Sequence, residues 1–428
     1  MKEQSTRVFI VEGARTPFLR AKGRGAFSAS DLAVSAARDV LLRGKVSPTQ
    51  IDEVITGCVM PSAYEANISR VVALRLGLDV STPAWTVQRN CASGMQALVS
   101  GMESIQRGQS QVVLAGGCES MSHAPLLFSP AMTDWLVRLQ QERTFLGKLK
   151  AYAAIRPAFF KPIIGLLLGL KDHQVNLSMG QTAEILAYDF HISREQMDEF
   201  SVMSHQRLAL AQKENRLKEV KPVYDSKGCV YDHDDGVRVD SSMEKLAKLS
   251  PVFDTRYGQV TAGNSSQISD GACYVLLASE KAVEQHQWPV LGEIVDYQWA
   301  ALDPSRMGLG PVHAIAPLLM RQQLKLEDVD YWEINEAFAV QVLACIEALA
   351  SDSYCKEKLG LAKAIGRLSL DRLNVDGGAI ACGHPVGASG ARISLHLLET
   401  LRARKAQQGI ASLCVGGGQG GAVLLRAC

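Results

Sequence analysis

The sequence lacks a long apolar run and a paired cysteine motif. None of its apolar runs reaches the ~18 residues that a membrane-spanning helix needs. The N-terminal segment MKEQSTRVFIVEGART has no secretory pattern. The 10 cysteines are irregularly spaced, without a Cys-x-x-Cys pair, so we expect neither a disulfide framework nor a metal site. We expect a reducing compartment: the cytoplasm, or the mitochondrial matrix in a eukaryote.

The sequence also has almost no net charge, and it lacks a dinucleotide fingerprint. A formal charge of +1 over 428 residues gives no global basic field, so we do not expect a nucleic-acid partner. No glycine motif of the dinucleotide-binding type follows the first apolar strand, so no redox cofactor is expected. Single thiols with a chemical role fit these exclusions best.

Short apolar segments alternate with helical patterns along the first part of the chain. Arg7–Val11, Val54–Val59 and Val112–Gly116 are predicted as strands, and Leu32–Leu42 as a helix. This alternation is typical of a layered α/β domain. In the last third, a small-residue turn, an amphipathic helix, an apolar strand and a glycine-rich loop recur about 300 positions later, which indicates internal duplication. Two unrelated βαβ-like units are the alternative.

The composition changes in the middle of the chain. Met132–Lys171 is rich in basic, leucine and aromatic residues, and Ser193 begins a polar helical stretch with a capping box. We therefore expect residues 125–250 to form an insertion. The first domain would comprise residues 1–124 and 251–287, and the second domain residues 288–428.

A cysteine stands before an apolar helical run in QRNCASGMQAL. Cys91 is followed by Ala92, Ser93 and Gly94, which leave room for a substrate to approach the sulfur. At a helix start, backbone N–H groups and the helix dipole favour the thiolate. The alternative is a small buried cysteine without a chemical role.

Three further segments carry groups suited to carbonyl chemistry. His384, in ACGHPVGASGAR, stands in a rigid, uncrowded turn where it could accept a thiol proton. Cys414 ends an apolar strand before the loop VGGGQGG, whose N–H groups suit an oxyanion. Asn335, in WEINEAFAVQ, could hold a water or donate to an oxyanion. Each has a structural alternative: a hydrogen-bonded turn histidine, a strand-end cysteine and a helix-start residue.

Taken together, these segments resemble the thiolase family. The motifs NCASGMQAL, AGGCESMS, GQVTAGNSSQISDGA, NEAFAVQ, GGAIACGHPVGASGAR and CVGGGQGGA resemble those of thiolases in order and spacing. The likeness extends from about Arg7 to Leu425. It implies an α/β fold of two similar domains in a five-layer αβαβα core, with a loop domain inserted in the first.

The resemblance implies a role for each motif residue. Cys91 would be the nucleophile that becomes acylated, and His384 would activate it. His384 and a water held by Asn335 would bind the thioester oxygen of the acetyl unit. Cys414 would move a proton on and off the acetyl carbon. The N–H groups of Cys91 and Gly416 would form the oxyanion hole for the acyl carbonyl.

Coenzyme A is the implied co-substrate, with no bound cofactor. By motif, Ser266, Met179 and Phe338 would line the pantetheine tunnel, and Arg238 would contact a phosphate. Many short-chain thiolases have a histidine where this chain has Ser178. This departure argues against a short-chain biosynthetic enzyme.

The insertion resembles the thiolase subunits of fatty-acid oxidation complexes. There the region forms a helical hairpin that can touch a membrane or a partner subunit, here a hydratase–dehydrogenase. The run Ile163–Leu170 is too short to span a bilayer, so a membrane contact would be peripheral. The alternative is that these residues wall the acyl tunnel or a subunit interface. Those subunits usually have a histidine where this chain has Asn335, which counts against close kinship.

The resemblance predicts a 3-ketoacyl-CoA thiolase of fatty-acid β-oxidation, because the family equilibrium favours cleavage. It would act on 3-oxoacyl-CoA and CoA as a homodimer or homotetramer. An acetoacetyl-CoA thiolase that condenses two acetyl-CoA molecules is the alternative. A ketoacyl synthase would lack the second cysteine, Cys414, and a non-catalytic lipid-binding relative would have lost a motif residue.

Overall fold

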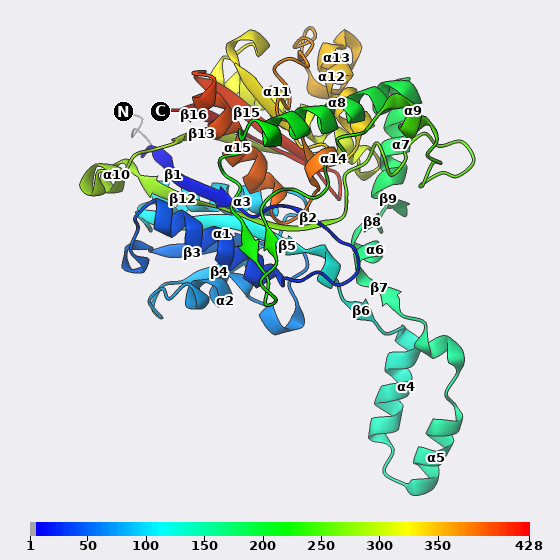
Figure 1. Ribbon diagram of the computed structural model, residues 1–428. Coiled ribbons are helices and arrows are strands. Elements are labelled where there is room, and N and C mark those ends of the chain that lie inside the picture. Colours follow the sequence, from blue (N-terminus) through cyan, green and yellow to red (C-terminus); the bar gives the residue numbers. More distant parts are fainter. Residues whose placement is uncertain (1–5) are drawn as a thin grey trace.

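The computed structural model describes residues 6–428, and its core is one hydrogen-bonded set of ten strands (Figure 1). In order across the sheet these are β14 (Tyr331–Ile334), β15 (Gln408–Val415), β16 (Gln419–Ala427), β13 (Gly292–Ala301), β1 (Val8–Arg15), β12 (Ser269–Ser279), β5 (Val112–Ser120), β3 (Glu53–Gly57) and β4 (Ala84–Val87). The short β2 (Leu19–Arg20) pairs with β12.

The strands fall into two halves that meet at a narrow junction. β1 and β13 pair only through Phe9 with Glu293 and Ile10 with Gly292. Each half contains parallel and antiparallel pairs: β5, β3 and β4 are parallel in the first, and β14 and β15 in the second. The narrow junction lets each half act as a separate layer.

Helices cover both faces of each half. The helices are α1 (Ala29–Arg43), α2 (Ile68–Arg75) and α10 (Glu280–His286) at the first half, α3 (Ser93–Gln106) and α15 (Ser389–Ala403) in the middle, and α11 (Gly310–Gln322), α12 (Ala339–Ala350) and α13 (Asp352–Leu359) at the second half. α3 and α15 pack on each other and on strands of both halves, so one apolar core spans the middle layer. Two more cores lie outside the sheets, which confirms the five-layer αβαβα arrangement.

The two middle helices begin without a side-chain cap, unlike α1. Ser28 and Asp31 form a reciprocal capping box at α1. In contrast, Ala92 precedes α3 and Ala388 precedes α15, and neither supplies a capping side chain. The first N–H groups of α3 and α15 therefore have no side-chain acceptor from their own cap.

Glycines allow the starts of α3 and α15 to touch. A Cβ added to Gly94 would lie 2.8 Å from the Gly387 carbonyl oxygen, and one on Gly390 would lie 2.6 Å from the Met95 nitrogen. A Cβ on Gly117 would overlap the same Gly387 oxygen. Any side chain at these positions would force the two helix starts apart.

The segment between β5 and β12 contains the remaining elements. They are β6 (Leu126–Leu127), α4 (Pro130–Gln141), α5 (Phe145–Ala153), β7 (Ile163–Ile164), α6 (Gly165–Gly169), β8 (Lys171–Asp172), β9 (Leu177–Ser178), α7 (Met179–Asp189), α8 (Arg194–Lys213), β10 (Val223–Tyr224), β11 (Val230–Tyr231) and α9 (Met243–Ala247). The buried Arg15 of β1 forms a bidentate pair with Asp234, with N–O distances of 2.7 and 2.8 Å. This pair ties the inserted segment to the core.

Helices α4 and α5 form a hairpin that projects from the body (Figure 1). The β6–β7 ribbon is its stalk, through pairing of Leu126 with Ile164 and Leu127 with Ile163. Trp135 holds the two helices together, because its indole Nε1–H donates to the Ala151 carbonyl at 2.7 Å. Among residues 6–428, no helix combines the length and the apolar character needed to cross a bilayer.

The local predictions are confirmed with shifted ends. The predicted strands lie within or overlap β1, β3 and β5, and the predicted helix lies within α1. Ser193 forms the expected capping box at α8. The run Ile163–Leu170 is not one element: it divides into β7 and α6. A last short helix, α14 (Ala379–Cys382), leads into the His384 turn.

Candidate active site

A cavity of about 510 Å³ opens beside the start of α3. It lies between the core and α6 of the inserted segment. Residues from six separate parts of the chain line it, including Met60, Cys91, Leu166, Met179, Val386 and Gly416. Cys91 and Gly416 therefore face the same space, and most of the wall around them is apolar.

Cys91 is held by two loops that are joined through Asn90. The Asn90 side-chain amide donates to the Gly416 carbonyl oxygen at 2.8 Å. The backbone of Asn90 has a φ of 42°, a left-handed conformation that asparagine tolerates better than most residues. The half-buried Cys91 is thereby placed next to the glycine loop that follows β15.

Two backbone N–H groups reach the Cys91 sulfur. Burial raises the pKa of the Cys91 thiol, and hydrogen bonds from the N–H groups of Gly416 and of Cys91 itself oppose that rise. These donors would stabilise a thiolate, and they equally suit an oxyanion on a carbon bound to the sulfur. Because burial outweighs them, the resting thiol needs a base to accept its proton.

His384 offers a neutral nitrogen as an acceptor. The Ser389 hydroxyl donates to the Pro385 carbonyl at 2.9 Å, so its oxygen accepts from His384 Nδ1–H at 2.6 Å. This arrangement leaves Nε2 unprotonated, and the Asn335 amide donates to it at 3.4 Å. Burial, together with the positive charge of Arg392, lowers the pKa of His384 to about 3. The imidazole is therefore neutral at physiological pH.

Asn335 is fully buried at the end of β14, with one free acceptor. Its backbone N–H donates to the Ser412 carbonyl at 3.0 Å, and its Oδ1 has no partner among residues 6–428. The neighbouring Glu336 accepts from Ser204 Oγ at 2.7 Å and from Asn374 Nδ2 at 2.9 Å. These bonds fix the Asn335 backbone while its side-chain oxygen stays available.

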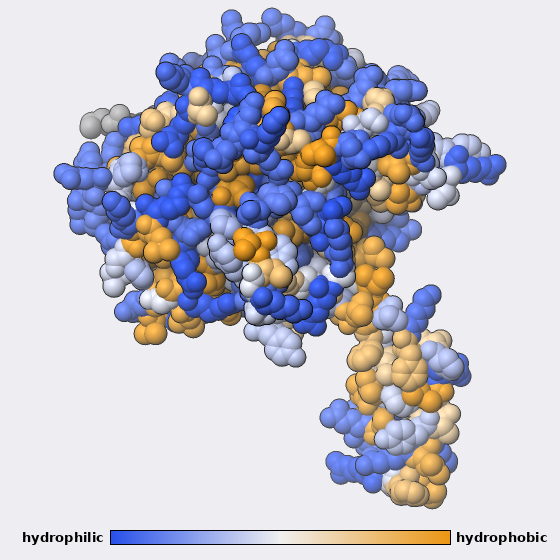
Figure 2. Space-filling view, in the orientation of Figure 1, coloured by the Kyte–Doolittle hydropathy of each residue, from blue (hydrophilic) through white to orange (hydrophobic). Residues whose placement is uncertain are grey.

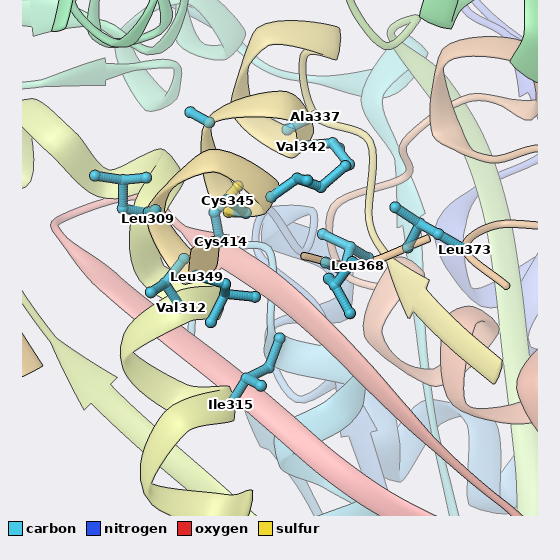
Figure 3. Close-up of a cluster of buried hydrophobic side chains, with 14 of the residues drawn as sticks. Leu309, Val312, Ile315, Ala337, Val342, Cys345, Leu349, Leu368, Leu373 and Cys414 are labelled. Atoms are coloured by element: carbon cyan, nitrogen blue, oxygen red, sulfur yellow. The ribbon is translucent and has the colours of Figure 1, made fainter. Parts of the chain in front are cut away.

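Cys414 is the more deeply buried of the two thiols. It lies beside Cys345 in the apolar core that also contains Leu309 and Val312 (Figure 3). Burial raises the pKa of Cys414 well above its usual range, and the nearby Cys91 raises it further. Cys414 therefore holds its proton firmly until a strong base, such as a carbanion, develops beside it.

The four predicted coenzyme A contacts lie in different surroundings. Met179 lines the cavity, at the start of α7, and Ser178 caps that helix by accepting from the Gln181 N–H. Ser266 is half-buried, and its N–H donates to the Ala337 carbonyl at 3.0 Å, beside the buried Phe338. Arg238 is exposed, and it makes no ion pair among residues 6–428.

Sequence reasoning assigned no role to two residues that position the site. Ser389 orients His384, and it stands within the GHPVGASGAR motif. Glu119 stands within AGGCESMS and accepts from backbone N–H groups of the cavity wall. The two motifs identified the right segments of the chain. The spacing of residues in the sequence could not show that Ser389 contacts His384 Nδ1, or that distant backbone N–H groups donate to Glu119.

The assembled groups suit the breaking or making of a carbon–carbon bond beside a carbonyl. One thiol faces two N–H donors, a buried neutral imidazole presents an unprotonated Nε2, and a second thiol lies close to the first. Among residues 6–428, no three His, Cys, Asp or Glu side chains gather as metal ligands would. Covalent catalysis by Cys91 needs only the groups already present.

Comparison with known proteins agrees with this chemistry. The model of the thiolase N-terminal domain matches residues 8–281, and that of the thiolase C-terminal domain matches residues 288–427. The human mitochondrial 3-ketoacyl-CoA thiolase is 40% identical over 98% of both chains. The 3-ketoacyl-CoA thiolase of Yersinia enterocolitica is 35% identical over 99% of this chain and 97% of the relative.

Solved structures are similar over the same length. The human mitochondrial 3-ketoacyl-CoA thiolase in complex with CoA is 38% identical, with a TM-score of 0.84 over 99% of this chain and 98% of the other. The Bacillus anthracis acetyl-CoA acetyltransferase is 34% identical, with a TM-score of 0.86 over 99% of both chains. With both family domains and full-length relatives, the chain belongs to the thiolase family.

Proposed function

We propose that this chain is a 3-ketoacyl-CoA thiolase of fatty-acid β-oxidation. It cleaves 3-oxoacyl-CoA with CoA into acetyl-CoA and an acyl-CoA that is two carbons shorter. The observation that carries this proposal is that Cys91 and the Gly416 loop, joined through Asn90, line one cavity with an apolar wall. Full-length relatives that are named 3-ketoacyl-CoA thiolases support it.

The first half of the reaction acylates Cys91. His384 Nε2 accepts the thiol proton, and the sulfur attacks the 3-keto carbon, whose oxygen becomes an oxyanion held by the N–H groups of Cys91 and Gly416. The bond between carbons 2 and 3 then breaks. The leaving enolate of acetyl-CoA is held by His384 and a water on Asn335, and it takes its proton from Cys414.

The second half transfers the acyl group to CoA. The Cys414 thiolate accepts the proton of the CoA thiol, which attacks the acyl carbon on Cys91. Cys91 leaves as a thiolate and recovers its proton from His384. All protons are thereby returned to their original groups, so the enzyme is ready for the next cycle.

The cavity favours an acyl chain longer than acetyl. Leu166 and Leu168 of α6 line it opposite Cys91, with Met60 and Met121 on the core side. These apolar side chains would stabilise several methylene groups, each worth about 0.8 kcal/mol when buried. Condensation of two acetyl-CoA molecules, the alternative, would leave this wall unused.

Coenzyme A would lie along the inserted segment. Met179, Ser266 and Phe338 would hold the pantetheine arm, the last two beside the Ser265–Phe338 bridge, and Arg238 would meet a phosphate. We retain the division into residues 1–124 with 251–287, residues 125–250, and residues 288–428. It is supported by the return of β12 to pair with β1 after the insertion.

The mitochondrial matrix or a bacterial cytoplasm is the proposed location, by analogy with relatives named as mitochondrial.

Thiolytic cleavage should rise with acyl chain length. Because the cavity wall is apolar, we expect kcat/KM to increase from acetoacetyl-CoA to 3-oxooctanoyl-CoA and 3-oxohexadecanoyl-CoA. The loss of absorbance of the 3-oxoacyl-CoA enolate–magnesium complex measures this rate. Activity confined to acetoacetyl-CoA would reject the β-oxidation assignment and favour the condensing enzyme.

Loss of the Ser389 hydroxyl should slow both half-reactions. Ser389→Ala leaves the buried His384 Nδ1–H without an acceptor, which costs about 1–3 kcal/mol, equivalent to a fall in kcat/KM of about fivefold to 150-fold. Ser394→Ala is the matched control, because its buried hydroxyl donates to the Gly390 carbonyl on the same helix. Equal rates for the two variants would show that Ser389 does not position the imidazole.

The edge strand β4 is a suitable surface for a second copy. It is the last strand of the sheet, and Trp85 in it is 39% exposed. An edge strand can pair with its own copy across a twofold axis. Light scattering should give two or four times the chain mass of 46.3 kDa, and a monomer would contradict this proposal.

The α4–α5 hairpin has the surface of a peripheral membrane contact. Phe145, Leu146 and Leu149 are 80%, 69% and 57% exposed, and orange apolar residues cover much of the hairpin in Figure 2. Residues 130–161 carry six basic and two acidic side chains. Exposed apolar side chains can insert into the surface of a bilayer, and the surrounding basic residues attract anionic lipid headgroups.

Vesicle sedimentation tests this contact. We expect the protein to sediment with anionic vesicles, and Leu146→Asp to abolish this without loss of acetoacetyl-CoA cleavage. Tyr64→Asp is the control, because Tyr64 is 98% exposed on the body. If the wild-type protein does not sediment with vesicles but co-elutes with a hydratase–dehydrogenase subunit, the hairpin binds that partner instead.

A further inference from the structure

A buried carboxylate near the end of β5 has four hydrogen-bond donors and, within residues 6–428, no cationic partner. Glu119 Oε2 accepts from the backbone N–H groups of Val59 at 2.9 Å and Gly387 at 3.1 Å. Its Oε1 accepts from the Met60 N–H at 3.0 Å, and the Cys58 thiol donates to it at 3.6 Å. Glu119 is 0% exposed and forms no ion pair among residues 6–428.

The donors belong to two segments that face Cys91 from different sides. Val59 and Met60 form part of the wall of the cavity that contains Cys91. Gly387 lies three residues after His384, just before α15, and its carbonyl meets Gly94 at the start of α3. One carboxylate therefore links the cavity wall, the His384 turn and the strand that carries Glu119.

The hydrogen-bond pattern requires the ionised form of Glu119. A protonated carboxyl would present an O–H to three backbone donors, and its one neighbouring acceptor would be the weak Cys58 sulfur. Burial raises the pKa of Glu119 to about 7, and the bonds from Val59, Met60, Cys58 and Gly387 oppose that rise. Burying a carboxylate without a cationic partner costs desolvation free energy. A buried carboxylate at this position therefore indicates a role in the site.

We propose that Glu119 is a positioning residue that, as a carboxylate, holds the cavity wall and the His384 turn in register around Cys91. The proposal rests on the thiolase function proposed above. Through Val59 and Met60 it sets the acyl wall, and through Gly387 it fixes the turn that aims His384. Glu119 itself acts through these backbone groups and does not contact the reacting atoms.

The ionisation of Glu119 gives this role a pH signature. Its folded pKa lies above the ordinary value for a carboxyl, so the folded protein takes up a proton as the pH falls through about 7. The titratable groups facing it are the Cys58 thiol after β3 and the Cys91 thiol before α3. His384 stays neutral down to a pH of about 3, so it does not account for a change near neutrality.

Glu119→Gln should imitate the protonated state at every pH. Its amide N–H₂ would face two backbone donors, so the cavity wall and the His384 turn would lose their fixed positions. We expect kcat/KM for 3-oxooctanoyl-CoA to fall at least about tenfold, because misplacement of a reacting group by about 1 Å can cost a hundredfold. The decrease in kcat/KM as the pH falls through about 7 should be absent from the pH profile of this variant.

Asp52→Asn is the matched control. Asp52 Oδ2 accepts from the backbone N–H groups of Gln111 at 2.7 Å and Val112 at 2.9 Å, at the opposite end of the same strand. This variant removes a carboxylate that braces the backbone of β5 away from Cys91. It should retain the wild-type rate and pH profile.

Alkylation of Cys91 by iodoacetamide gives a readout that does not depend on turnover. The negative charge of Glu119 raises the pKa of Cys91, so Glu119→Gln should shift the midpoint of alkylation to lower pH. A purely structural residue would leave this midpoint unchanged. If the wild-type protein cleaves no 3-oxoacyl-CoA, the proposed function fails, while the alkylation midpoint still tests Glu119.

Glu119→Asp keeps the test open if the glutamine variant does not fold. Its shorter carboxylate keeps the charge near Cys91, so the alkylation midpoint should stay at the wild-type value. It cannot reach all four donors, so KM for 3-oxooctanoyl-CoA should rise more than KM for acetoacetyl-CoA. A wild-type KM for both substrates in Glu119→Asp, or a wild-type rate and midpoint in Glu119→Gln, would overturn the proposal.

Discussion

The whole site depends on the close approach of two helix starts. Gly94 of α3 and Gly390 of α15 leave no side chain between the helices, and Gly117 of β5 makes room for the Gly387 carbonyl. Neither helix has a capping side chain, and the first N–H of each donates to a backbone carbonyl of the preceding turn, Ser93 to Asn90 and Ser389 to Pro385, both at 3.0 Å. The glycines of the two motifs are thus a packing requirement, and the chemistry follows from the contact that they allow.

The second constraint is the burial of the two thiols, half-buried for Cys91 and complete for Cys414. Burial raises the pKa of Cys91 and, more strongly, that of Cys414. Cys91 receives two backbone N–H groups and Cys414 one, so a negative charge is better stabilised on Cys91. In the proposed mechanism the neutral His384 supplies the missing base, and it is charged only while it holds the Cys91 proton. The difference in environment therefore separates a nucleophile from a proton carrier.

The inserted segment connects the wall of the Cys91 cavity to the projecting α4–α5 hairpin. α6 lines the cavity, and it follows directly on β7, the second strand of the hairpin stalk. Gly165 at the start of α6 donates its N–H to the Pro125 carbonyl at 3.0 Å, next to the first stalk strand. The wall opposite Cys91 is consequently connected to the projecting α4–α5 hairpin by a short, hydrogen-bonded ribbon.

Much of this architecture was readable from the sequence, because it is encoded locally. Apolar periodicity and capping boxes placed β1, α1 and α8, and the small-residue motifs marked Cys91 and His384. The role of Glu119 was not readable, since its partner Gly387 is 268 positions away. The α4–α5 hairpin was expected only from the resemblance, because an amphipathic pattern does not specify whether a helix packs on the core.

Acylation of the Cys414→Ala variant tests the central claim, that two thiols divide the chemistry, most directly. The variant is incubated with octanoyl-CoA, and the Cys91 peptide is then weighed by mass spectrometry. We predict one octanoyl group on Cys91, together with loss of 3-oxooctanoyl-CoA cleavage, because no proton reaches the leaving enolate. An unmodified Cys91, or cleavage that persists at the wild-type rate, would contradict the account.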